Sequence, residues 1–220
     1  MAKVFLSPSN QYDNRYAYGD TTEGVQCGKI ADACKIALER SGVDVMLMHD
    51  ESMQTKCAES NKFGADLHVP IHTNAFNGKV MGTRMFCYNT GKGMAACKAI
   101  FARVAPLSPG TSENIQVNSD YYEVRVPAAP TAYIECEFHD TVEGAKWIVE
   151  NTVLIGETIA RGICDYFGVT FKEPEQPKPA AGATIYRVQV GAYTKKENAE
   201  NMLAKLKKDG YSGFIVEGKL

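Results

Sequence analysis

The sequence predicts an α/β fold, in which a mixed, mostly parallel sheet is flanked by helices on both faces. Short apolar runs of strand length alternate with longer amphipathic runs of helix length, and this alternation is typical of such sheets. Two of the strand runs, residues 66–75 and 130–139, carry histidines and acids among apolar residues. Because charged groups are rarely buried without a partner, these two runs indicate one shared polar site.

The individual elements follow from apolar spacing and from turn residues. Thr22 is a candidate cap for the first long helix, and Gly42 is its expected stop. We expect the helices at residues 22–42, 52–63, 93–104, 141–151 and 153–167. We expect the strands at residues 4–6, 43–48, 66–75, 81–88, 124–126 and 130–139, with a loop at 106–114.

The last fifty or so residues differ in composition from the rest. Residues 171–183 are rich in proline, which predicts a semi-rigid linker. Residues 184–220 predict one βαβ unit with strands at 185–192 and 214–216, which is too small to bury a core alone. The predicted organisation is therefore a domain over 1–170, a linker, and a small C-terminal unit.

Composition restricts the function classes. The chain of 220 residues has a net charge of −2, so nucleic acid is not an expected partner, and no apolar run is long enough to span a membrane. The N-terminus leads directly into a strand, so we expect no signal peptide and synthesis in the cytoplasm. The seven cysteines are scattered without a CxxC pair, which argues for reduced, buried thiols and against a disulfide scaffold or a thiolate zinc site. A nucleophilic Cys136 is kept as a minor alternative.

Three residues stand out as candidates for chemistry. His72 lies at the end of a buried strand, where sites of α/β proteins form, and its imidazole is a candidate metal ligand. Glu135 occupies the second polar strand run. Glu23 lies in the first turn of the first helix, where the helix dipole alone would also favour a carboxylate.

Short motifs along residues 1–168 occur in the order found in a known family. They are Glu23 opening the first helix, Asn61 and Asp66 before Ile71-His72-Thr73-Asn74-Ala75, Val124-Arg125 before a proline-containing run, and Pro130 before Ile134-Glu135. On these motifs the domain resembles the zinc-dependent N-acetylmuramoyl-L-alanine amidases, which cut the bond between the glycan lactyl group and the stem peptide of peptidoglycan. The resemblance implies Zn²⁺ ligation by Glu23 and His72, with Glu135 as the catalytic carboxylate. Arg125 and Asn74 are the expected substrate-binding residues.

The sequence departs from this family at the first zinc ligand. The family has a histidine in the loop after the first strand, and Asn10 stands there in this chain. His68 lies roughly 13 Å from His72 at strand rise and cannot share an ion with it. Strand alternation places Glu135 and His139 on one face, so His139 is the expected third ligand. Asn10 or Gln11, directly or through a water, is the alternative.

The C-terminal unit resembles the first half of a SPOR domain, a peptidoglycan-binding module, on Tyr186-Arg187-Val188-Gln189-Val190-Gly191-Ala192-Tyr193 and the helix that follows. The sequence ends before the second half of such a domain, so the unit is either truncated or completed by a second copy, in a homodimer. The expected function is zinc-dependent lysis of the cell wall after release from the cytoplasm, as by a phage lysin. The alternatives are a non-catalytic peptidoglycan-binding protein with a degenerate amidase site, and another zinc hydrolase with a small substrate.

Overall fold

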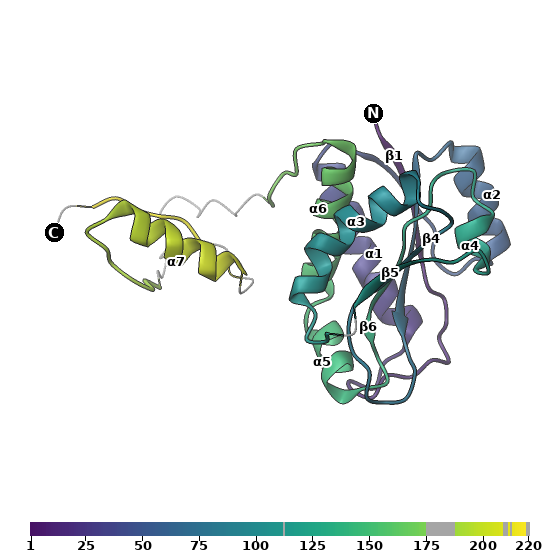
Figure 1. Ribbon diagram of the computed structural model, residues 1–220, viewed down its shortest axis with the longest axis horizontal. Coiled ribbons are helices and arrows are strands. Elements are labelled where there is room, and N and C mark those ends of the chain that lie inside the picture. The colour runs from purple at the N-terminus through teal and green to yellow at the C-terminus, as the bar shows by residue number, and fades with distance from the viewer. Residues whose placement is uncertain (112, 175–187, 209–210, 212, 219–220) are drawn as a thin grey trace, which may run out of the picture. The chain divides into compact units, whose positions relative to one another are not determined.

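The computed structural model describes residues 1–111, 113–174, 188–208, 211 and 213–218. The chain divides into two compact units, Met1–Pro174 and Glu175–Leu220. The first unit contains a sheet and its covering helices (Figure 1). The sheet has six strands in the order β2-β1-β3-β6-β4-β5. The predicted α/β class is confirmed.

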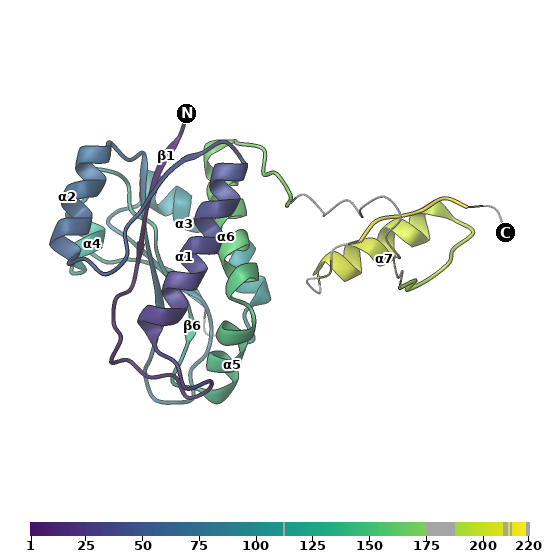
Figure 2. The ribbon, with the colours of Figure 1, turned by 180° about the vertical axis from the view of Figure 1, so that it is seen from behind.

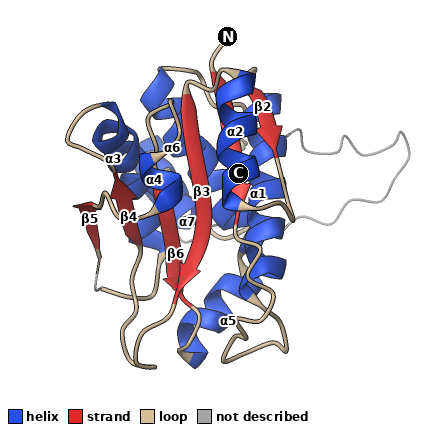
Figure 3. Cartoon of the chain, turned by 90° about the vertical axis from the view of Figure 1, so that its right-hand side faces the viewer, coloured by secondary structure: helices blue, strands red, loops and turns tan. Residues whose placement is uncertain are grey.

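Strands β1, β2, β3 and β6 run parallel to one another, and β3 and β6 lie side by side in the middle of the sheet (Figure 3). Strand β4 is antiparallel to β6 and parallel to β5, so the sheet is mixed. The strand bounds are β1 Lys3–Pro8, β2 Asp44–Leu47, β3 Leu67–Asn74, β4 Arg84–Cys87, β5 Asn114–Val117 and β6 Tyr133–Phe138.

Helices cover both faces of this sheet (Figures 1 and 2). One face packs against α1 (Glu23–Arg40), α3 (Lys92–Val104) and α6 (Thr152–Phe167), and the other against α2 (Met53–Phe63) and α4 (Tyr122–Arg125). The remaining helices of this unit are α5 and the short 3₁₀ helix η1, which span Val142–Glu150 and Ala105–Leu107.

The two faces of the sheet differ in chemistry because side chains alternate along each strand. The face toward α1 and α6 is apolar and includes Val69 and Ile71 of β3, which belong to the main hydrophobic core. The opposite face carries His68 and His72 from the same strand, and both side chains are buried. This second face positions the polar site.

A register shift between β3 and β6 breaks the alternation near the site. His72 pairs with Glu135, whereas Asn74 pairs with Phe138, so β6 has one residue more than β3 over this stretch. Such an extra residue is a β-bulge and reverses which face the following side chains occupy. The prediction that Glu135 and His139 share one face is therefore wrong, because it assumed unbroken alternation.

Two segments differ from the predicted elements. Residues 124–126, predicted as a strand, lie at the end of the one-turn helix α4. The predicted loop 106–114 contains part of η1 and the start of β5. Both segments are short, and the apolar period of such short runs does not separate strand from turn.

The second unit contains α7, Lys196–Lys208. Residues 188–192 and 214–216, predicted as strands, form no strand in the described part of this unit, and the predicted strand residues 185–187 lie outside the described ranges. A strand requires a hydrogen-bonded neighbour, and the described residues offer none here. Over these same ranges, no helix has both the length and the apolar character of a membrane-spanning segment.

Close packing of α6 depends on a glycine. A Cβ atom at Gly156 would lie 2.4 Å from the carbonyl oxygen of Ile30 in α1. We predict that Gly156→Ala destabilises the protein by about 1–3 kcal/mol, because the rigid backbone of α1 must move. Gly28→Ala is the matched control, since a Cβ there meets only His49 at 3.5 Å and alanine favours a helix. Equal thermal unfolding midpoints for the two variants would contradict this account of the packing.

Candidate active site

A buried carboxylate and a buried imidazole meet where α1 begins and β3 ends. Glu23 Oε1 lies 2.9 Å from His72 Nδ1, and the two residues are 2% and 9% exposed. Burial opposes charge on both groups, but their mutual hydrogen bond outweighs it, so the pKa of Glu23 is lowered and the pKa of His72 is raised. Each group therefore favours the charged form of the other.

Amide side chains from the loop after β1 complete the surroundings of this pair. The Gln11 side-chain amide lies 3.4 Å from Glu23 Oε1 and 3.5 Å from His72 Nδ1. Asn14 donates to the other oxygen of Glu23 at 2.8 Å, and the Tyr133 ring stacks on His72 at a centroid distance of 4.6 Å. Two potential metal-ligand atoms, Glu23 Oε1 and His72 Nδ1, and the Gln11 amide nitrogen thus lie within 3.5 Å of one another.

Glu135 lies next to this pair, since it is the β6 partner of His72. It is 7% exposed, and its Oε2 atom has no hydrogen-bond partner among the described residues. Burial raises the pKa of Glu135 to about 7, and the positive charge of His72 offsets only part of that effect. A buried carboxyl group with a near-neutral pKa is suited to general acid–base chemistry.

Two of the three candidate third ligands, Asn10 and His139, have other partners for their side chains. Asn10 is exposed, and its side chain donates to the Glu51 carbonyl oxygen at 3.0 Å. His139 is buried, lies 3.0 Å from the Thr73 hydroxyl and stacks on Tyr16. Its ligand atoms do not join those of Glu23 and His72 in a group of metal-ligand spacing within the described ranges. Of the residues named from the sequence, Gln11 is the one that reaches the pair.

The two predicted substrate-binding residues, Asn74 and Arg125, lie at different places in the fold. Asn74 ends β3, and its side chain accepts a hydrogen bond from the Ala75 amide at 2.8 Å. Arg125 is exposed at the end of α4. Neither residue lines the cavity described next, so their roles stay predictions.

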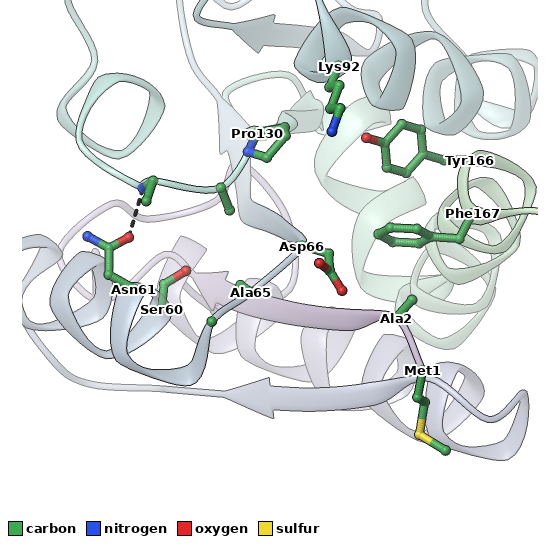
Figure 4. Close-up of a pocket in the computed structure, with 13 residues that line it drawn as sticks. Met1, Ala2, Ser60, Asn61, Ala65, Asp66, Lys92, Pro130, Tyr166 and Phe167 are labelled. Atoms are coloured by element: carbon green, nitrogen blue, oxygen red, sulfur yellow. Dashed lines mark hydrogen bonds between the residues drawn. The ribbon is translucent and has the colours of Figure 1, made fainter.

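A cavity of about 260 Å³ opens beside the pair. Most of the residues that line it are polar, and Lys56 and Glu123 are of opposite charge type. The lining consists of Pro8, Ser9, Asn10, Gln11, Met53, Lys56, His72 and Glu123. A larger hollow of about 730 Å³ lies at the other end of the strands, where its lining includes Asp66 and Lys92 (Figure 4). That hollow contains no histidine, so we place the chemistry at the smaller cavity.

Sequence reasoning missed a second polar cluster on the same face of the sheet. Cys57, His68 and Glu123 are buried, and their ligand atoms lie within 4.8 Å of one another. All seven cysteines are buried and unbridged, as expected, but the expectation against a thiolate site overlooked Cys57. Cys136 has a pKa raised well above its usual value by burial, so its thiol is not a ready nucleophile.

A sequence model described as "N-acetylmuramoyl-L-alanine amidase" matches residues 8–165, and a second, described as "SPOR domain", matches residues 168–217. The first match covers well over half of the chain. The chain therefore belongs to the N-acetylmuramoyl-L-alanine amidase family, and its C-terminal region matches the SPOR domain.

Two curated relatives match along nearly the whole chain. The sporulation-specific N-acetylmuramoyl-L-alanine amidase of Bacillus subtilis (strain 168) is 22% identical over 98% of this chain and 85% of its own length. The N-acetylmuramoyl-L-alanine amidase CwlM of Bacillus licheniformis is also 22% identical, with the same two coverages.

Solved structures share the fold of the first unit. The catalytic domain of CwlV, an N-acetylmuramoyl-L-alanine amidase from Bacillus (Paenibacillus) polymyxa var. colistinus, has a TM-score of 0.68 at 16% identity and covers 77% of this chain and 100% of its own. The catalytic domain of the CD27L endolysin has a TM-score of 0.66 at 17% identity and covers 75% and 98%. At these identities the likeness establishes the fold alone.

The raised pKa of Glu135 predicts a pH-dependent cost to stability in the metal-free protein. Because the pKa is raised, the Glu135 carboxyl group binds its proton more tightly in the folded state than in the unfolded chain. The stabilisation that protonation supplies is thus complete below the ordinary pKa of 4.5 and is lost as the pH rises through about 7. Glu135→Gln should remove this loss and be more stable than the wild type above pH 7, by up to about 3 kcal/mol. Denaturant unfolding at several pH values measures the difference.

The exposed Glu150 offers a control for this comparison, and Glu150→Gln should follow the wild type at every pH. If Glu135→Gln also followed the wild type from pH 4 to pH 8, the buried, proton-retaining state of Glu135 would be refuted.

Proposed function

We propose that the protein hydrolyses the amide bond between the lactyl group of N-acetylmuramic acid and L-alanine in peptidoglycan, with the aid of a zinc ion. Family membership supports the reaction class. The observation that carries the proposal for this chain is the buried Glu23–His72 pair next to Glu135, one oxygen of which has no hydrogen-bond partner in the described part of the chain. A fold that only bound the wall would have no need for this costly arrangement.

The residues at the pair fit a zinc ion by their chemistry. Carboxylate oxygen and imidazole nitrogen are both common zinc ligands, and Glu23 and His72 supply them. We propose the Gln11 side-chain oxygen as the third ligand, since the amide group is near both others. In the structure its nitrogen faces the pair and its oxygen accepts from Asn14 at 2.8 Å, so the amide would turn and give up that hydrogen bond when the ion binds. Zinc in such a site lowers the pKa of a water and polarises the scissile carbonyl.

The chain's own residues perform the proton transfers and the positioning. Glu135 accepts a proton from the water whose oxygen attacks the scissile carbonyl carbon. When the carbon–nitrogen bond breaks, Glu135 returns that proton to the leaving amine of L-alanine. Asn14 orients Glu23, and Tyr133 holds the ring of His72 by stacking. Lys56 and Glu123 line the cavity beside these groups.

The C-terminal region would hold the enzyme on its polymeric substrate. Its match to the SPOR domain supports a peptidoglycan-binding role, which raises the local concentration of cleavable bonds near the first unit. The site of action is then the cell wall. Release by a phage-lysin-like route and homodimer formation through the C-terminal unit stay predictions from the sequence.

Cleavage of purified peptidoglycan tests the proposed reaction. The wild type should release stem peptides that carry a new free amine on L-alanine, and Glu135→Gln should lower the rate by about 10²–10⁴-fold, because the proton acceptor is lost. Peptide release is measured by labelling new amines and by mass spectrometry of the soluble products. Wild-type protein that contains zinc and binds peptidoglycan but releases no peptide would favour the non-catalytic binding protein instead.

Zinc binding discriminates between the candidate third ligands. Gln11→Ala should weaken zinc binding by about tenfold or more, and His72→Ala should abolish zinc at this site. Asn10→Ala and His139→Ala serve as matched controls that should retain zinc affinity, because their side chains point to other partners. Loss of zinc in His139→Ala with retention in Gln11→Ala would reverse the assignment.

A further inference from the structure

The second polar cluster lies under the helices that cover the polar face of the sheet. Cys57 comes from α2, His68 from β3 and Glu123 from α4, and α2 and α4 lie side by side (Figures 1 and 2). The three residues are 1%, 0% and 3% exposed. A thiol, an imidazole and a carboxylate thus meet in the interior, on elements far apart in sequence.

The spacing of the imidazole nitrogen and the carboxylate oxygen fits tetrahedral metal coordination, and the Cys57 sulfur lies within 4.8 Å of both. Two nitrogen or oxygen ligands at zinc bond lengths of about 2.0–2.1 Å and a tetrahedral angle are separated by about 3.3–3.4 Å. His68 Nε2 and Glu123 Oε1 are separated by 3.4 Å. This distance is long for a charge-assisted hydrogen bond, which is typically about 2.7–2.9 Å, so the pair is better spaced for a shared cation than for direct contact.

The outer partners of a metal site are also present. His68 Nδ1 lies 3.0 Å from the Ser60 hydroxyl, which leaves Nε2 directed at the cluster. Glu123 Oε1 accepts a hydrogen bond from the Ser7 hydroxyl. Metal-bound histidines commonly have their second ring nitrogen held in this way, and such outer partners orient the ligands.

Charge and access support the same assignment. A thiolate and a carboxylate together balance a divalent cation, whereas the isolated charges would be costly to bury. Glu123 lines the cavity of about 260 Å³ described above, so one side of the cluster borders that cavity. This cluster uses neither Glu23 nor His72, and His68 and His72 are too far apart along β3 for one ion.

We propose that Cys57, His68 and Glu123 form a second metal site, specific for zinc or a similar divalent transition metal, that is distinct from the Glu23–His72 site. Its role is structural: one ion ties α2 and α4 to β3. Because Glu123 also lines the cavity, the ion fixes one wall of the active-site cavity. The thiol proton is released when the ion binds.

Cobalt substitution tests this site independently of activity. Full-length protein is stripped of metal and titrated with Co²⁺, which gives a near-ultraviolet charge-transfer absorption only when it is bound to a thiolate. The wild type should show this band and bind about two Co²⁺ per chain. Cys57→Ser should lose the band and bind about one, while His72→Ala should keep the band and also bind about one.

Cys164→Ala is the matched control, because Cys164 is equally buried but lies in α6 on the other face, and this variant should keep the band. If Cys57→Ser does not fold, Glu123→Gln provides the second test, with at least about tenfold weaker binding of the band-forming ion. Absence of the band in the wild type, or its persistence in Cys57→Ser, would overturn the proposal. Loss of the band in His72→Ala would show a single shared site and would also overturn it, whatever the outcome for peptidoglycan cleavage.

Discussion

The contact between Glu23 and His72 is the interaction on which the site depends. It exists because β1 and β3 are parallel neighbours, so that the loop after β1, the start of α1 and the end of β3 meet at one edge of the sheet. The N-terminus of α1 favours the negative charge of Glu23, and that charge holds the imidazole of His72. Glu135 then joins the site through its pairing with His72. Any change that slides β3 against β1 or β6 would separate all three groups.

The division of the sheet into an apolar and a polar face explains how one domain combines stability with chemistry. The apolar face packs on α1 and α6, where Gly156 permits close contact and the core is continuous. The polar face buries His68, His72, Glu123 and Glu135. Burial of such groups lowers stability unless they are paired or bound to a cation. The buried polar groups therefore lower the free energy of unfolding, and such a loss of stability is usual at functional sites.

The sequence was sufficient for the α/β class and for the residues that meet at the edge of the sheet. Apolar runs of distinct length predict the elements, and His72 and Glu135 stand out as polar residues in buried strand runs. Glu23 was singled out only by the family resemblance, since a carboxylate in the first turn of a helix is common. The bulge in β6 could not be predicted, because both strands keep their apolar pattern through it, and the placement of His139 failed for that reason.

Glu123 was missed because its one-turn helix has no periodic pattern, and Cys57 and His68 were missed because their approach depends on how α2 packs against β3. Gln11 stood only as an alternative, since the loop after β1 has no repeating geometry from which a side-chain direction follows.

The central claim is that the polar face of this sheet is built around bound metal. The most direct measurement is an anomalous-difference map, collected at the zinc absorption edge from crystals of the full-length protein grown with zinc. The account predicts a strong peak between Glu23 and His72, next to Gln11, and a second peak between Cys57, His68 and Glu123. A map without density at the Glu23–His72 pair, from protein that nevertheless cleaves peptidoglycan, would contradict it.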